Sequence, residues 1–162
     1  MLRGLRPAVN DGRISLSDYG ALETSIALLT GMLGALPQDR QTVGIMHADG
    51  HKGNMLYDEG KVRLIDFSFC AFGNYMFDLG ICFADMKEPL HRAFLDAYQS
   101  LRPLPRDYQR LVEGFFVGGM VGTFSYWVDN PDAQELLVRK APQIVGDYAK
   151  EFNRGEFFWF RG

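Results

Sequence analysis

Polar residues at short, regular spacing fill one stretch of the sequence, residues 44–80. His47, Asp49 and His51 alternate along the chain, and Asn54 comes five residues after Asp49. Phosphoryl transfer from a nucleotide needs a carboxylate beside the attacking hydroxyl, which it orients and deprotonates. The reaction also needs oxygen ligands for the Mg²⁺ that accompanies the phosphates, and Asn and Asp side chains supply such ligands. The stretch therefore favours phosphoryl-transfer chemistry.

A β hairpin is predicted directly after Asn54. Two short runs of strand-forming residues, 55–57 and 62–65, flank a turn sequence that contains Gly60. Asp66 follows the second run at once, so the hairpin folds Asn54 and Asp66 back side by side. The sequence thus predicts a pair of metal ligands next to the candidate base Asp49.

These motifs resemble the C-terminal lobe of the aminoglycoside phosphotransferase and choline kinase-like family. The family's loop reads His-Gly-Asp-x-His-x-x-Asn, and an Ile-Asp pair and an Asp-Leu-Ala/Gly element follow it. The corresponding residues here are His47 to Asn54, Ile65-Asp66 and Asp78-Leu79-Gly80. The resemblance implies that Asp49 is the catalytic base and that His51 lies near the transferred phosphate. It further implies that Asn54 and Asp66 bind Mg²⁺, and that His47 and Asp78 brace the loop.

The resemblance also implies the fold and the reaction. We expect residues 1–162 to form a mainly helical α+β lobe of protein-kinase-like fold, with residues 43–80 as its catalytic and metal-binding segment. The reaction is the transfer of the γ-phosphate of ATP or GTP to a hydroxyl of a small molecule. The chain departs from the family at Gly50, where an apolar residue is usual, and from protein kinases at Ser68, where they have glycine.

Only 48 residues precede Asp49, and they do not resemble a nucleotide-binding N-terminal lobe with its phosphate-covering loop and strand lysine. We therefore expect this lobe to be absent and the isolated chain to be inactive. The surface that normally faces the lobe would then be exposed, which favours a homodimer.

Helices are predicted to surround the catalytic segment. Residues 1–14 read as an irregular lead-in, a helix capped by Ser17 follows, and residues 43–46 read as a buried strand. Asp78 is expected to cap a short helix to Met86. Residues 86–153 are predicted to form a helical substrate subdomain of three helices. The first begins near Pro89 and is expected to turn Leu90, Phe94, Ala97 and Leu101 inward. The second covers residues 107–128, and the third runs from 130 to 152 with a kink at Pro142.

Composition narrows the function further. The 162 residues are 47% hydrophobic with a net charge of −3, and the absence of a basic run argues against nucleic acid binding. The apolar stretch 114–128 is shorter than the ~20 residues of a membrane helix and is predicted to be a buried helix. No targeting segment is visible, and Cys70 and Cys82 are expected to be reduced packing thiols, so the interpretation is a cytoplasmic protein.

Two acidic residues and two further functions complete the predictions. Asp85 and Glu113 are candidates to bind a cationic group of the substrate. One alternative function is a non-catalytic binding module derived from a kinase lobe. The other is a metallohydrolase in which His47, Asp49 and His51 face one metal ion.

Overall fold

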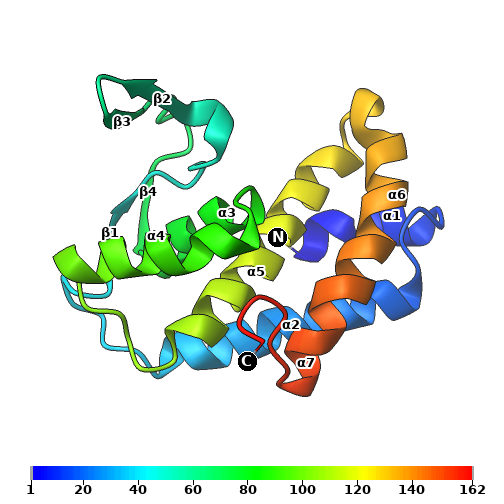
Figure 1. The fold of residues 1–162 in the computed structure, drawn as a ribbon. Coiled ribbons are helices and arrows are strands. Elements are labelled where there is room, and N and C mark those ends of the chain that lie inside the picture. Colours follow the sequence, from blue (N-terminus) through cyan, green and yellow to red (C-terminus); the bar gives the residue numbers. More distant parts are fainter. Residues whose placement is uncertain (1, 162) are drawn as a thin grey trace. The chain divides into compact units, whose positions relative to one another are not determined.

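The computed structural model describes residues 2–161, which are mainly helical with two small antiparallel sheets (Figure 1). The chain divides into two units. Ala35–Phe116 forms one unit, and Met1–Gly34 together with Val117–Gly162 forms the other. The predicted fold class, a mainly helical α+β chain with a small hairpin, is confirmed.

The unit of residues 35–116 contains all four strands. Strand β1 (Val43–Met46) pairs with β4 (Ala71–Asn74), and β2 (Met55–Asp58) pairs with β3 (Lys61–Leu64). The turn of the β2–β3 hairpin has positive φ at Glu59 and Gly60, as a two-residue type I′ turn requires. This hairpin was predicted, whereas β4 was not.

Three helical segments complete this unit: α3 (Met76–Ala84), α4 (Glu88–Leu101) and the beginning of α5 (Tyr108–Val128). The predicted helix cap at Asp78 is wrong. The helix starts two residues earlier, where Asn74 Oδ1 accepts a hydrogen bond of 2.9 Å from Met76 N. Asp78 lies in the first turn of α3, so its side chain is available for other donors.

The inward face of α4 also differs from the prediction. Leu90 and Leu101 are exposed, while His91 and Leu95 are buried. The His91 ring stacks on Phe83 with the ring centroids 4.0 Å apart. A pattern that counts histidine as polar selects the wrong face, because here the imidazole packs like an aromatic side chain.

The other unit is built on α2 (Leu16–Gly34). Its remaining elements are η1 (Leu2–Leu5), α1 (Arg6–Asn10), the end of α5, η3 (Pro131–Ala133), α6 (Gln134–Ile144), the π-helical η4 (Val145–Ala149) and α7 (Lys150–Arg154). Asn153 of α7 donates to Ala21 O and accepts from Ser25 Oγ, which ties α7 to α2.

Three predictions for this second unit need correction. Within the predicted irregular lead-in, residues 2–10 are helical, with Leu5 and Ala8 fully buried, and Pro7 stands at the start of α1, where its lack of an N–H is harmless. The cap of α2 is Ser15, whose Oγ accepts from Asp18 N, and not Ser17. The segment predicted as one helix from 130 to 152 is instead a succession of η3, α6, the π-helical η4 and α7, and Pro142 lies inside α6.

Helix α5 is the candidate for a membrane span among the described residues, by length and composition only. Of its most apolar 18-residue window, 61% is buried inside the structure. Residues 111–118 are all buried, as expected for a core helix. The prediction of a buried central helix agrees with this burial.

Surface residues qualify two other predictions. Cys82 is partly buried, but Cys70 lies exposed in the loop between Asp66 and β4, so Cys70 is not a packing residue.

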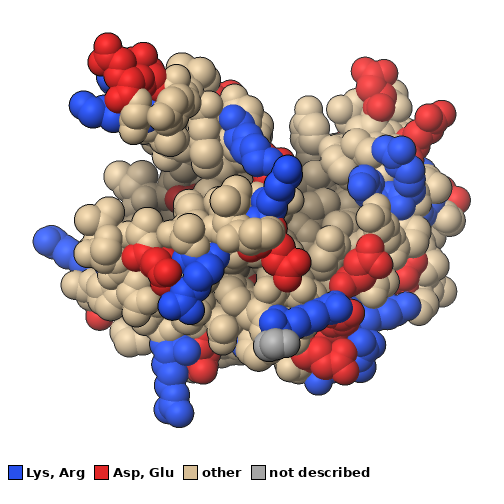
Figure 2. Space-filling model, in the orientation of Figure 1, with Lys and Arg blue, Asp and Glu red and all other residues tan. Residues whose placement is uncertain are grey.

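Charges of both signs are interspersed on the face shown in Figure 2. Many exposed large apolar side chains belong to the strands and loop of residues 45–72, namely Ile45, Leu56, Tyr57, Val62, Leu64, Ile65, Phe67, Phe69 and Phe72. Homodimer formation through such a surface stays a prediction.

Helix α3 approaches the backbone of α5 closely at Gly80. A Cβ atom added there would lie 2.8 Å from Val112 O and 3.0 Å from Phe116 N, both of them backbone atoms. Since backbone cannot rotate aside as a side chain can, only glycine fits between these two helices.

We expect Gly80→Ala to lower the free energy of unfolding of its unit by about 2 kcal/mol through overpacking. Gly31→Ala is the matched control, because Gly31 is an exposed glycine in the last turn of α2 with nothing within 4 Å of an added Cβ. The control should raise the stability by about 1 kcal/mol through helix propensity. Urea unfolding measures both variants, and a Gly80→Ala protein as stable as the parent chain would contradict the packing.

Candidate active site

The loop after β1 is held by the carboxylate of Asp78. Asp78 Oδ2 accepts from His47 N at 2.9 Å, and Oδ1 accepts from Ala48 N at 2.7 Å. Both oxygens of one carboxylate therefore bind two successive backbone N–H groups. Hydrogen bonds to a charged acceptor are among the stronger ones in proteins. Asp78 thus fixes the point where strand β1 passes into the loop.

Ala48 has an unusual backbone conformation at this point. Its φ is +64°, in the left-handed region that glycine enters freely and alanine enters at a cost of about 1 kcal/mol. A left-handed residue lets successive N–H groups converge on one anion. This conformation explains why glycine suits the second position of the His-Gly-Asp pattern, even though alanine occupies it here.

The buried ring of His47 links the loop to the end of the hairpin. His47 Nε2 lies 2.9 Å from Ile65 O, and Nδ1 accepts from Asp49 N at 3.3 Å. These two partners place the proton on Nε2, which donates to the carbonyl. The ring also packs on Phe67, with centroids 4.5 Å apart. His47 therefore joins the segment that carries Asp49 to the segment that carries Asp66.

Asp49 and Asn54 contact each other directly. Asn54 Nδ2 donates to both the backbone O and the Oδ2 of Asp49, each at 2.9 Å. Asn54 is buried, whereas the side chain of Asp49 is 32% exposed. No described protein group donates to Asp49 Oδ1 or to Asn54 Oδ1, so one oxygen of each side chain stays open to a ligand.

His51 lies next to Asp49 on the same loop. Its Nδ1 accepts from Gly53 N at 3.0 Å, which leaves the proton on Nε2. Nε2 lies 3.6 Å from Asp49 Oδ2, and the His51 side chain is 45% exposed. The structure therefore brings the predicted base and the second histidine together, with the imidazole N–H close to the carboxylate.

The hairpin places Asp66 beside Asn54. Ile65 N donates to Asn54 O at 3.0 Å, so the residue before Asp66 is bonded directly to Asn54. Asp66 has a φ of +58°, and its Oδ1 accepts from both the N–H and the hydroxyl of Ser68. These hydrogen bonds, first that of the Ser68 hydroxyl, lower the pKa of Asp66 below its usual value. The carboxylate is thus kept ionised.

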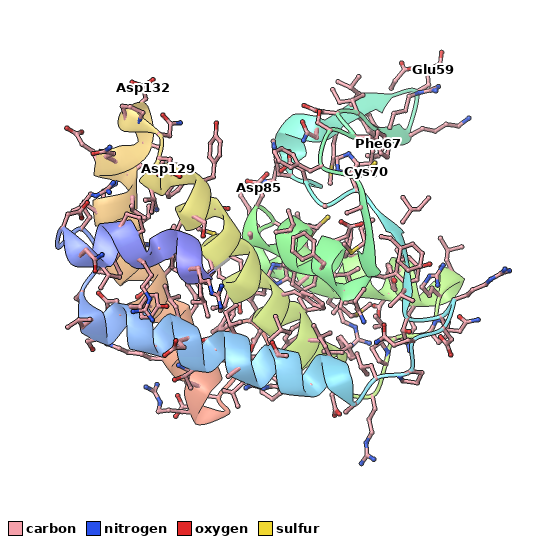
Figure 3. The ribbon with its side chains drawn as sticks, turned by 180° about the vertical axis from the view of Figure 1, so that it is seen from behind. Glu59, Phe67, Cys70, Asp85, Asp129 and Asp132 are labelled. Atoms are coloured by element: carbon pink, nitrogen blue, oxygen red, sulfur yellow. The ribbon has the colours of Figure 1, made fainter. Side chains whose placement is uncertain are left out.

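The two candidates for substrate binding lie in different surroundings. Asp85 follows α3 and accepts from Lys52 N at 2.8 Å, so it adjoins the loop (Figure 3). Glu113 lies in α5, fully buried, with one oxygen 3.9 Å from Arg110 Nη1. A carboxylate without solvent exposure is not open to a substrate in this structure, so the geometry does not support the prediction for Glu113.

Two contacts of the site were not predicted from the sequence. Ser68 was noted only as a departure from a glycine, yet it is the main partner of Asp66. The sequence predicts Cys82 to be a packing residue, yet its Sγ donates to Gly50 O at 3.1 Å. The spacing of Cys82 and Asp85 from Asp78, four and seven residues, is the helical signal that places all three near the loop.

The metallohydrolase alternative does not fit this geometry. Both ring nitrogens of His47 have protein partners, and Nδ1 of His51 does as well. Within residues 2–161, no group of three or more His, Cys, Asp or Glu side chains is arranged to hold a metal ion. The alternating pattern of histidines and aspartate therefore serves to shape the loop.

Comparisons with known proteins agree with the geometry. Residues 5–111 match the family model described as phosphotransferase enzyme family, APH. The homoserine kinase of Neisseria meningitidis serogroup B is 33% identical over 145 residues, which cover 80% of this chain and 45% of the relative. The homoserine kinase of Acidiphilium cryptum is 31% identical over 137 residues, which cover 76% of this chain and 41% of the relative.

A solved structure has the same fold. An amicoumacin kinase in complex with AMP-PNP, Ca²⁺ and Ami superimposes with a TM-score of 0.62 at 18% identity, over 90% of this chain and 47% of the kinase. The chain spans less than half the length of the curated relatives it matches. With two thirds of its residues matched by the family model, the chain belongs to the APH phosphotransferase family.

Proposed function

We propose that this chain carries the catalytic loop and the metal ligands of a kinase that phosphorylates a hydroxyl of a small molecule, with ATP or GTP as donor. One observation carries the proposal. A single hydrogen-bonded unit joins the loop of Asp49 and Asn54 to the end of the hairpin, where Asp66 lies. A base and oxygen ligands held on one rigid segment are what phosphoryl transfer requires.

The oxygen atoms at the site fit a magnesium ion. Asn54 Oδ1 and one oxygen of Asp66 have no donor among the described residues, and the ionised state of Asp66 is favoured by Ser68. Hard oxygen ligands of this kind are those that Mg²⁺ prefers. Asn54 and Asp66 would hold the ion, which when bound neutralises charge on the phosphates.

Asp49 is assigned the role of the base. The amide of Asn54 fixes its Oδ2, and Oδ1 stays open to accept the proton of the attacking hydroxyl. General-base help of this kind accelerates a reaction by about 10²–10⁴-fold. His51, whose Nε2 lies 3.6 Å from Asp49 Oδ2, is placed to orient the same groups.

Homoserine is the first acceptor to test. The curated relatives are homoserine kinases, and homoserine is an amino acid with a primary hydroxyl, within the class of acceptors that the motifs predict. We assign the covering of the nucleotide phosphates to an N-terminal lobe, since the described residues before Asp49 form helices and one strand. By this proposal, the 162-residue chain alone binds ATP weakly.

The test joins this chain to the N-terminal portion of the Neisseria relative and measures ATP-dependent phosphorylation of homoserine, choline and an aminoglycoside. We expect Asp49→Asn to lower kcat by about 10²–10⁴ with nearly unchanged nucleotide affinity, because only base catalysis is removed. Asp96→Asn, an exposed substitution on α4, is the control. Full turnover by Asp49→Asn would show that the base is assigned wrongly.

A second prediction concerns the pH below which the site no longer binds a metal ion. Ser68→Ala removes the main hydrogen bond to Asp66 and should raise the pKa of this carboxyl toward its usual value. Metal binding needs the ionised carboxylate, so it should fail at a higher pH than in the parent chain. Carbon-13 NMR titration of the Asp66 carboxyl measures the shift, and Ser100→Ala on α4 should leave the titration unchanged. An unmoved titration curve in Ser68→Ala would exclude this role of Ser68.

A further inference from the structure

We propose that one face of α3 positions the catalytic loop at three points, and that Cys82 and Asp85 are positioning residues for Asp49. This inference rests on the function proposed above. Asp78, Cys82 and Asp85 are spaced at i, i+4 and i+7, which places them along one side of a helix. Each of the three bonds to the backbone of the loop.

Cys82 and Gly50 form a matched pair. The thiol donates to Gly50 O at 3.1 Å, and a Cβ atom added to Gly50 would lie only 3.1 Å from Cys82 Sγ. Burial raises the pKa of Cys82 to about 12, so the thiol keeps its proton and remains a donor at neutral pH. Gly50 stands where an apolar residue is usual in the family, and here the Cys82 sulfur occupies the space that such a side chain would fill.

Asp85 binds Lys52 twice. Its Oδ2 accepts from Lys52 N at 2.8 Å, and its Oδ1 lies 3.6 Å from Lys52 Nζ. Figure 3 shows Asp85 at the end of α3 that is near the loop. Both oxygens of the carboxylate are therefore directed at a residue of the loop. This geometry favours a positioning role for Asp85 over the substrate-binding role predicted from the sequence.

Together these contacts restrain the chain on both sides of the base. Asp78 binds the residue before Asp49, Cys82 binds the residue after it, and Asp85 binds the loop three residues beyond it. Displacement of a catalytic group by about 1 Å can lower a rate by as much as 10²-fold. We expect loss of either contact to reduce turnover without weakening the binding of the nucleotide.

Hydrogen exchange on the 162-residue chain tests the contacts without any need for activity. In Asp85→Ala, the Lys52 amide should exchange about tenfold faster than in the parent chain. Urea unfolding of both proteins measures the change in global stability, for which the exchange rate is corrected. Asp85→Asn keeps an acceptor oxygen and should restore most of the protection. In Cys82→Ala, amides of residues 49–52 should exchange several-fold faster, and Cys82→Ser should restore part of the protection. Unchanged exchange in both alanine variants would overturn the proposal.

Kinetics in the joined protein distinguish positioning from substrate binding. Asp85→Ala and Cys82→Ala should lower kcat about tenfold with the KM for both substrates within twofold, and Asp85→Asn and Cys82→Ser should recover activity. The exposed Cys70→Ala and Asp96→Asn are controls. A raised KM for the acceptor in Asp85→Ala, with kcat unchanged, would overturn the positioning role. If the parent protein transfers no phosphate, the proposed function fails while the exchange result still decides the contacts.

Discussion

The site depends on the binding of two successive backbone N–H groups by the Asp78 carboxylate. This contact fixes the exit of β1 and stabilises the left-handed conformation of Ala48, which alanine does not favour by itself. From that point the loop turns so that the His47 ring reaches Ile65 O and Asn54 reaches Asp49. Without the carboxylate, two partly buried N–H groups would lose their acceptor, and the loop would lose its starting direction.

The hairpin solves a second geometrical problem. Asn54 and Asp66 are twelve residues apart, and an extended chain would separate them widely. The antiparallel pairing of β2 with β3 returns the chain, so that Ile65 N bonds to Asn54 O. The proposed metal ligands and the proposed base are therefore held by local hydrogen bonds within one segment.

The sequence predicts this segment well because its determinants are local. Residue types at fixed spacing and a glycine-containing turn predict the loop, the hairpin and the place of Asp66. Strand β4 was missed because its partner β1 lies some 25 residues earlier and its own sequence contains a glycine. The inward face of α4 was misjudged because the burial of His91 depends on its stacking with Phe83, which is a tertiary contact.

The roles of Cys82, Asp85 and Ser68 depend equally on tertiary or turn geometry. Cysteine in an apolar segment predicts packing, and only the approach of Gly50 O shows that the thiol is a donor. The sequence at Asp85 predicts only a charged surface residue, and the structure shows that its carboxylate accepts a hydrogen bond from Lys52 N of the loop. In each case the residue type is visible in the sequence, but its partner is not.

By the function proposed above, the loop and the hairpin of this chain form one divalent-metal site. Paramagnetic broadening by Mn²⁺, observed in amide NMR spectra of the 162-residue chain, tests this claim most directly. We expect the strongest broadening at residues next to Asn54 and Asp66, and its loss in Asp66→Asn. Broadening centred elsewhere, such as at the exposed Asp129 and Asp132 labelled in Figure 3, or unchanged broadening in the variant, would contradict it.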